Sequence, residues 1–154
     1  MDDLDARLPP ILTDADYERL AELRYSLRGF LHWSAQRARE AGITPTQHQL
    51  LLTIRSSRTA RGATIREVAE VLLIRHHSAV GLVDRAQEAG LITRERDPEQ
   101  QSVVHLKLTE WGAVTVSSLS AVHLRELTQL APTMQALLAA LTEGEAARLK
   151  LFRT

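Results

Sequence analysis

The stretch from Thr64 to Thr109 constrains the fold of this chain most, because two helix patterns and two strand patterns follow one another within it. A first helix is predicted from the T-x-x-E capping box that Thr64 and Glu67 form. A second helix is predicted from about His76 to Ala89, with Gly90 as its C-terminal stop. One face of this second helix is apolar at helical spacing, and we expect it to be buried: Ala79, Leu82, Val83 and Ala86. The residues off this stripe are expected to be exposed: Arg75, His76, His77, Ser78, Val80, Gly81, Asp84 and Arg85.

Two strand-like runs follow the second helix, at residues 91–96 and 103–108, and the polar segment DPEQQS between them has the composition of a turn. Two short helices, a tight turn and a β-hairpin make a winged helix-turn-helix. This arrangement is well suited to placing its second helix in the major groove of DNA. The alternative is a small α+β module without that role.

Long amphipathic helices are predicted on both sides of this unit. One runs from the T-x-x-D start at Thr13 to about Ala41, and another runs from Thr109 to about Leu130, where Pro132 interrupts it. A further helix is predicted between the first of these helices and Thr64, from the cap at Thr44, with Pro45 at its first position and Gln47 at N3, to near Arg58. Short helices at 134–141 and 146–152 are expected to follow Pro132. These helices carry more apolar surface than the central unit can cover, which predicts a homodimer built from the two termini. A helical bundle within one chain is the alternative.

The expected fold class is therefore mainly α with a small β-hairpin wing, a winged helix-turn-helix with long terminal dimerisation helices. We divide the chain into an N-terminal arm at 1–12, a helical dimerisation region at 13–43 and 110–154, and a winged helix-turn-helix DNA-binding domain at 44–109.

Composition excludes several classes of protein. The chain has no cysteine, so disulfides and thiolate metal sites are excluded. No apolar run approaches the length of a membrane span, and the acidic N-terminus lacks the apolar core of a signal peptide, so we expect a cytoplasmic protein. We find no nucleotide-binding glycine motif and no catalytic motif, and we expect neither an enzyme nor a cofactor.

The formal net charge is zero, which argues against a generic basic nucleic-acid binder. The charges are unevenly distributed, however. From Arg24 to Arg66 there are eight arginines and one acid, and from Arg75 to Val83 there is no acid. Local sign matters more than the sum, because salt screens charges beyond about 8–10 Å.

The order of elements resembles the MarR family, bacterial winged helix-turn-helix transcription regulators. The resemblance covers about residues 17–141 and depends on three motifs: GITPTQHQLLLTI (42–54), TIREVAEVLLIRHHSAVGLVDRAQEAGLITRERD (64–97) and LTEWG (108–112). It implies a homodimer with interlocked terminal helices that binds pseudo-palindromic double-stranded DNA. It also implies release of that DNA when a small, often phenolic or otherwise aromatic, effector binds.

The candidate DNA-binding residues lie on the second helix and on the hairpin. They are Arg75, His76, His77, Ser78, Val80, Gly81, Arg85, Arg94, Arg96 and Gln101. The wing tip departs from the family, whose Asp-Arg-Arg-like run is replaced by Gln100, Gln101 and Ser102. Because arginine is favoured in a narrow minor groove and glutamine carries no charge, we expect a weak minor-groove contact.

Effector-binding candidates are His32, Trp33 and His48. The resemblance places the family's effector pocket between the first two helices, the helix after the wing and the helix-turn-helix. The alternative is a core tryptophan beside a satisfied histidine. The adjacent His76 and His77 point about 100° apart on a helix and make poor partners for one metal ion, so no metal site is expected. The sequence predicts a ligand-responsive repressor. The alternative from another class is a winged-helix protein–protein interaction module without DNA binding.

Overall fold

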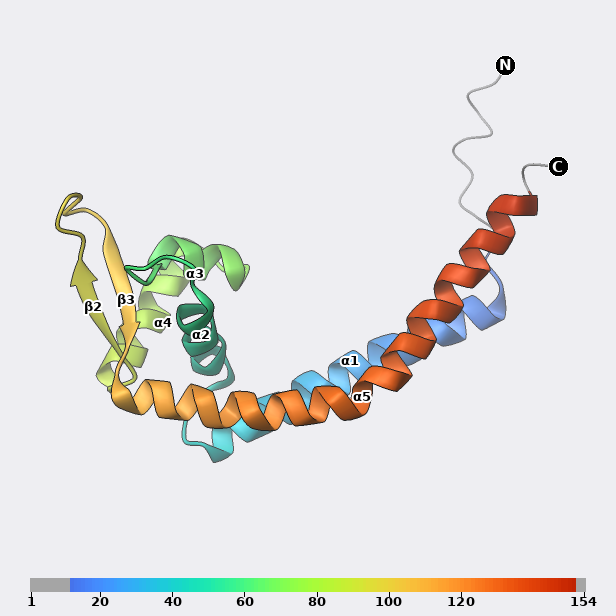
Figure 1. The fold of residues 1–154 in the computed structure, drawn as a ribbon, viewed down its shortest axis with the longest axis horizontal. Coiled ribbons are helices and arrows are strands. Elements are labelled where there is room, and N and C mark those ends of the chain that lie inside the picture. The colour runs from blue at the N-terminus through green and yellow to red at the C-terminus, as the bar shows by residue number, and fades with distance from the viewer. Residues whose placement is uncertain (1–11, 152–154) are drawn as a thin grey trace, which may run out of the picture. The chain divides into compact units, whose positions relative to one another are not determined.

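The computed structural model describes residues 12–151, and their side chains as far as Gly144. The chain order is α1 (Asp14–Glu40), α2 (Pro45–Ser56), β1 (Ala63–Thr64), α3 (Ile65–Val71), α4 (His76–Glu88), β2 (Ile92–Arg96), β3 (Val104–Leu108) and α5 (Glu110–Leu151) (Figure 1). Apart from Leu12, the arm predicted at 1–12 lies outside the described residues, as do the side chains of the short helix predicted at 146–152.

Capping boxes start three of these helices where the sequence predicted them. The Asp16 carboxylate accepts from the Thr13 backbone N–H at 2.9 Å ahead of α1. The boxes Thr44–Gln47 and Thr64–Glu67 are both complete, each with a side-chain oxygen bound to a backbone N–H in both directions. Each box satisfies amide groups that the first helical turn leaves without partners, which fixes where α2 and α3 begin.

The predicted hairpin is present and gains a third strand. The sheet order is β1-β3-β2, and both pairings are antiparallel. In β1, Ala63 lies opposite Leu106 and Thr64 lies opposite His105. A strand of two residues shows no alternation of polar and apolar side chains, which explains why the sequence pattern did not reveal it.

The prediction that Pro132 interrupts the helix after the wing was wrong, because α5 continues from Glu110 to Leu151. A proline inside a helix removes one hydrogen bond and costs roughly 3 kcal/mol. Leu130, Met134 and Leu137 continue a helical stripe across the proline, and all three are partly or fully buried. Packing of this stripe holds the helix together where the local propensity opposes it.

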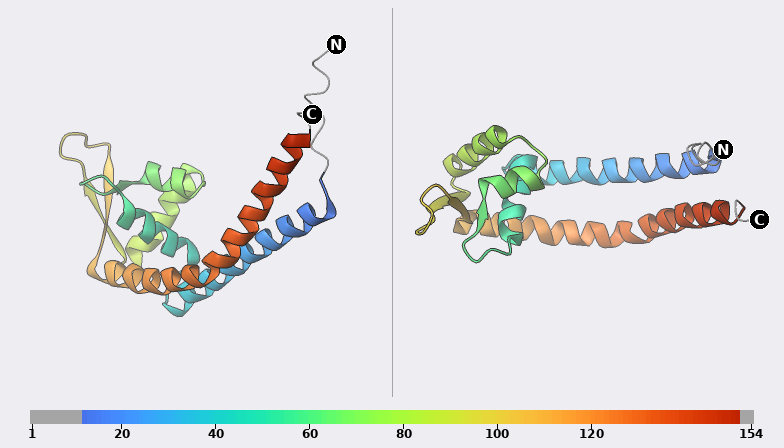
Figure 2. Two further views of the ribbon diagram at one scale, coloured as in Figure 1. Left: turned by 45° about the vertical axis from the view of Figure 1, so that its right-hand side comes forward. Right: turned by 90° about the horizontal axis from the view of Figure 1, so that it is seen from above.

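The chain forms two compact units, with boundaries inside α1 and α5. The unit at 32–125 contains the core, where α2, α3 and α4 lie beside the sheet (Figure 2). Gly112, from the LTEWG motif, allows the start of α5 to lie close to the backbone of Leu91, since a Cβ at Gly112 would lie 2.0 Å from the Leu91 carbonyl oxygen. Its described fully buried large side chains are Leu50, Leu51, Val68, Val83, Leu91, Ile92, Leu106 and Val116.

The other unit, described at 12–31 and 126–151, is helical and leaves many apolar side chains exposed. A groove of about 340 Å³ separates its two helical segments and is lined mainly by apolar residues, among them Leu27, Phe30 and Leu130. No helix in the described part of the chain is long and apolar enough to cross a membrane.

Candidate nucleic-acid interface

Helix α4 separates a buried face from an open one. The predicted apolar stripe of Ala79, Leu82, Val83 and Ala86 is buried, which confirms that prediction. Arg75, His76, His77 and Ser78 at its start are all exposed, whereas Val80 and Gly81 are half-buried. Arg75 is the N-cap and makes no side-chain capping hydrogen bond. The first turn of α4 therefore presents four polar side chains to solvent beside the positive end of the helix dipole.

Further along α4, the Arg85 side chain lies back over Gly81. A Cβ built on Gly81 would be 3.3 Å from the Arg85 Nη1 atom. Within the described residues, neither Arg75 nor Arg85 forms an ion pair with a carboxylate, in contrast to several other arginines of this unit. The charges of Arg75 and Arg85 thus remain available to an anionic partner.

A hollow of about 180 Å³ joins the start of α4 to the wing. Its lining includes Thr64 and Arg66 at the start of α3, His76 of α4, and Ser102 and Val104 of the hairpin. The hollow therefore connects the first residue of α4, the predicted DNA contact His76, with the hairpin.

The wing's own cations are mostly bound to carboxylates. Arg94, a predicted DNA contact, is half-buried and binds Asp84 of α4 at 2.5 Å and Gln87 at 2.9 Å. Lys107 binds Glu95 on the neighbouring strand at 2.5 Å. The predicted contacts Arg96 and Gln101 are exposed. Arg94 thus ties the wing to α4, and its charge is already compensated by Asp84.

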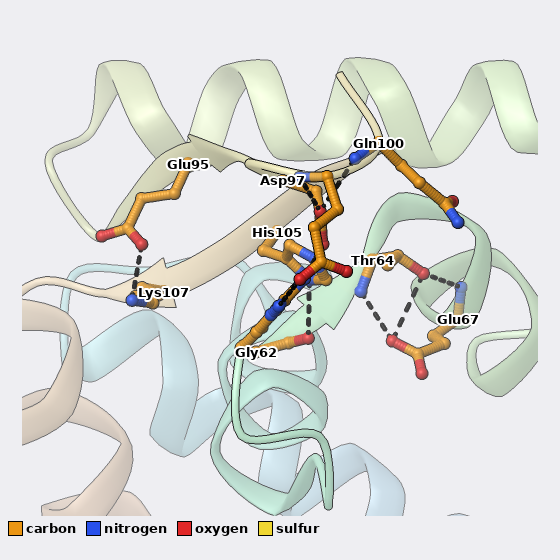
Figure 3. Close-up of polar contacts among 10 residues, drawn as sticks. Gly62, Thr64, Glu67, Glu95, Asp97, Gln100, His105 and Lys107 are labelled. Carbon is orange, nitrogen blue, oxygen red and sulfur yellow. Dashed lines mark hydrogen bonds and ion pairs between the residues drawn. The ribbon is translucent and has the colours of Figure 1, made fainter. Parts of the chain in front are cut away.

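The sequence did not reveal one polar cluster, formed by Arg61, Asp97 and His105 (Figure 3). Asp97 is buried and accepts from both other side chains. Its pKa lies far below the usual range of an aspartate, through the His105 hydrogen bond first and the Arg61 hydrogen bond second. The Asp-Pro pair at 97–98 signalled a turn, but Arg61 lies 36 residues away and no local pattern links it to the wing.

The effector candidates fall into two groups. Trp33 and His48 lie together around His123 of α5, which the sequence analysis did not select, whereas His32 is exposed. The His123 ring lies 5.0 Å from the Trp33 ring and 4.7 Å from the His48 ring, between centroids. The His123 Nε2 atom is 2.6 Å from the Ser34 hydroxyl.

His48 is buried, and its Nε2 atom has no hydrogen-bond partner within the described residues. Burial, and then the nearby His123, lower the pKa of His48 below that of an ordinary histidine. A neutral ring with one unsatisfied nitrogen in an aromatic setting is able to bind one further polar group.

The three-stranded sheet with α3 and α4 defines a winged helix-turn-helix protein. Residues 41–101 match the family model described as MarR family. This match covers the winged helix-turn-helix part of the chain, from just before α2 to the turn of the hairpin. The match favours DNA binding over the alternative of a protein–protein interaction module.

Solved structures of several regulators share the fold. AbsC, a MarR family transcriptional regulator from Streptomyces coelicolor, gives a TM-score of 0.69 at 19% identity over 92% of this chain and 99% of that chain. An S. aureus MepR mutant bound to an oligodeoxyribonucleotide gives 0.62 at 18% identity over 89% and 99%. CouR from Rhodococcus jostii bound to p-coumaroyl-CoA gives 0.64 at 20% identity over 84% and 95%. Comparison with curated protein sequences gives no significant match.

Proposed function

We propose that this regulator binds a pseudo-palindromic operator as a homodimer and represses transcription until a small aromatic ligand binds. Each protomer would insert α4 into the major groove, with half-sites about one helical turn apart.

The observation that carries the proposal is the open first turn of α4. Arg75, His76, His77 and Ser78 are exposed at the helix start while the opposite face is buried. Arginine and serine side chains and either form of histidine can bind base edges or phosphates, and recognition helices use their N-terminal residues for base contacts. The hollow shared with Ser102 extends this surface to the wing.

The dimer is supported by the apolar surface of the helical unit. Leu20, Leu27 and Leu31 of α1 are exposed to 46%, 46% and 57%, and Leu138 of α5 to 52%. Exposed apolar side chains that recur at helical spacing are suited to burial against a second copy, and one of them, Leu27, also lines an apolar groove.

The ligand role is supported by the cluster of Trp33, His48 and His123. An aromatic wall beside a buried ring nitrogen without a partner fits a small molecule with an aromatic ring and one hydroxyl or carbonyl group. In CouR, a relative by fold, the bound molecule is p-coumaroyl-CoA.

The test of operator binding is a fluorescence-anisotropy titration with DNA from the gene's own promoter at two salt concentrations. We expect saturable binding that weakens steeply with salt, because phosphate contacts release counterions. Binding that does not saturate, or that is equal for a scrambled duplex, contradicts the proposal.

The dimer and the ligand have separate tests. Sedimentation at micromolar concentration should show a species of roughly twice the 17.2 kDa chain mass, and a monomer would refute the dimer. Titration with p-coumarate should release the DNA from the wild type but not from a Trp33→Leu variant that still binds the operator. Equal release from both proteins would remove Trp33 from the ligand site.

A further inference from the structure

The wing tip is closed by Asp97 at the end of β2. The Asp97 Oδ1 atom accepts from the backbone N–H groups of Glu99 and Gln100, at 2.8 and 3.0 Å. The Asp97 N–H donates to the Val103 carbonyl at 2.9 Å, and the Val103 N–H donates to the Gln100 carbonyl at 2.8 Å. One carboxylate and two backbone hydrogen bonds therefore fix the tip before any ligand arrives.

Asp97 is itself held by two side chains from outside the tip. Its Oδ2 atom accepts from Arg61 Nη1 at 2.7 Å and from His105 Nε2 at 2.9 Å. Figure 3 shows Asp97 beside His105. Arg61 belongs to the loop between α2 and β1, and its other nitrogen, Nη2, donates to Glu99 at 3.1 Å. A carboxylate that accepts from four donors is ionised, and here it links the tip to the sheet and to that loop.

Both ring nitrogens of His105 face hydrogen-bond acceptors. Nε2 faces the Asp97 carboxylate, and Nδ1 lies 3.2 Å from the carbonyl oxygen of Gly62. Neither acceptor carries a proton to donate, so both hydrogen bonds form together only on a doubly protonated ring. The backbone at Gly62 requires glycine, because its φ is +99° and a Cβ would lie 2.5 Å from the Leu106 carbonyl oxygen.

The charged groups around His105 come from β2, β3, the loop before β1, the wing tip and α3. Glu95 lies opposite it on β2 and is bound to Lys107 of β3. Arg61 and Glu99 flank Asp97 on the loop side. From α3, Glu67 is bound to the backbone of Thr64, the residue opposite His105 in β1. Both neighbouring cations, Arg61 and Lys107, are thus already ion-paired.

The fixed conformation of the wing tip is important for binding because the tip carries little positive charge to attract DNA. Gln100, Gln101 and Ser102 are exposed and uncharged, so they gain no direct attraction to phosphates. Ordering a flexible loop on binding costs conformational entropy, which lowers the affinity. Weak contacts are the least able to offset this entropy cost. A tip that is already ordered keeps such contacts useful.

We propose that Arg61, Asp97 and His105 are positioning residues for DNA binding, which hold the uncharged wing tip in its binding conformation. The inference rests on the proposed operator binding and adds to it an explanation of how the wing tip is held ready to contact DNA.

The first test compares two variants that each remove one negative charge near the tip. Removing a carboxylate beside DNA should by itself strengthen binding, and Glu99→Gln is expected to bind as tightly as the wild type or more tightly. Asp97→Asn places an amide against Arg61 and His105 and should bind about five- to tenfold more weakly, because the tip must then be ordered on binding. Equal or tighter binding by Asp97→Asn would overturn the inference.

A footprint separates failure of this inference from failure of operator binding. In Asp97→Asn, the wing should no longer protect the minor groove from hydroxyl radicals. The protection from methylation that α4 gives to the major groove should persist. Uniform loss of both would indicate a general folding defect and contradict selective positioning. Absence of any wild-type footprint would instead refute operator binding, and the inference with it.

Discussion

Helix α4 and the wing differ in how their cations are paired with carboxylates. Arg75 and Arg85 of α4 have no carboxylate partner within the described residues. On the wing, Arg94 and Lys107 are each bound to a carboxylate, and Arg61 is bound to the tip through Asp97. The arginine charges of α4 are thus available to an anionic partner, whereas most positive charges of the wing are bound within the protein.

This difference implies that α4 and the wing contribute to DNA binding in different ways. An unpaired exposed arginine retains its attraction for phosphates, whereas an ion-paired one must first lose its protein partner. Ion pairs on the wing instead restrict its motion relative to α4, through Arg94 and Asp84, and relative to the loop before β1, through Arg61. We therefore expect affinity to depend chiefly on α4 and wing contacts to depend on geometry.

The largest effect should come from removing an unpaired arginine of α4. Arg75→Ala should weaken operator binding by about 1–3 kcal/mol, and if Arg75 contacts a phosphate it should lower the salt slope by about one. The matched variant on the wing is Arg96→Ala, which removes an exposed arginine from β2 and should cost less. Anisotropy titrations at several salt concentrations measure both. A larger loss for Arg96→Ala would reverse the comparison.

A gain of function on the wing should be the next largest effect. Gln101→Arg restores a charged tip side chain on a loop that is already ordered, and should tighten binding by up to about tenfold with a salt slope steeper by about one. Gln101→Lys adds the same charge without the planar guanidinium and should gain less, since narrow minor grooves favour arginine. If neither variant changes affinity, the tip does not reach the DNA.

Stability and affinity should change in opposite directions at Gly81. Glycine within a helix is less stable than alanine by roughly 0.5–1 kcal/mol, and the only atom near the added Cβ is the movable end of Arg85. Gly81→Ala should therefore raise the free energy of unfolding by about that amount, measured by urea denaturation. Operator affinity should fall, because α4 cannot approach the groove as closely. Unchanged affinity would place Gly81 away from the DNA.

The sequence predicted the parts of the fold that depend on local pattern. The capping boxes at Thr44 and Thr64 and the buried stripe of α4 were found because each involves residues within a few positions of one another. The continuity of α5 through Pro132 was missed because packing of neighbouring turns outweighs a local propensity.

The candidate site divides in the same way. Exposure of Arg75 to Ser78 followed from helical periodicity alone. The partners of Asp97 did not, since Arg61 precedes it by 36 residues and reaches it only after β1 pairs with β3. His123 was also missed, because its proximity to Ser34 joins residues 89 positions apart. Long-range polar contacts depend on the tertiary fold, which periodicity does not report.

The smallest effect concerns acid, and it should separate the two regions by their chemistry. Asp97 has a lowered pKa in the folded wing, so it binds fewer protons there than in an open or unfolded wing. Its stabilising contribution is complete above the ordinary aspartate pKa of about 3.9 and is lost as the pH falls further toward its lowered value. No carboxylate has the corresponding role at the start of α4, where Arg75 makes no side-chain cap.

Hydrogen exchange provides the measurement. Below about pH 4, amide protection at Glu99 and Gln100, corrected for intrinsic rates, should decrease relative to protection in α4. The lowered pKa of His48 complicates absolute values, because the folded unit binds fewer protons than the unfolded chain and loses stability once the pH falls below about 6.5. That loss acts on the whole unit, so the ratio of wing to α4 protection isolates Asp97. A ratio that stays constant to about pH 3 would show that the wing does not depend on this carboxylate.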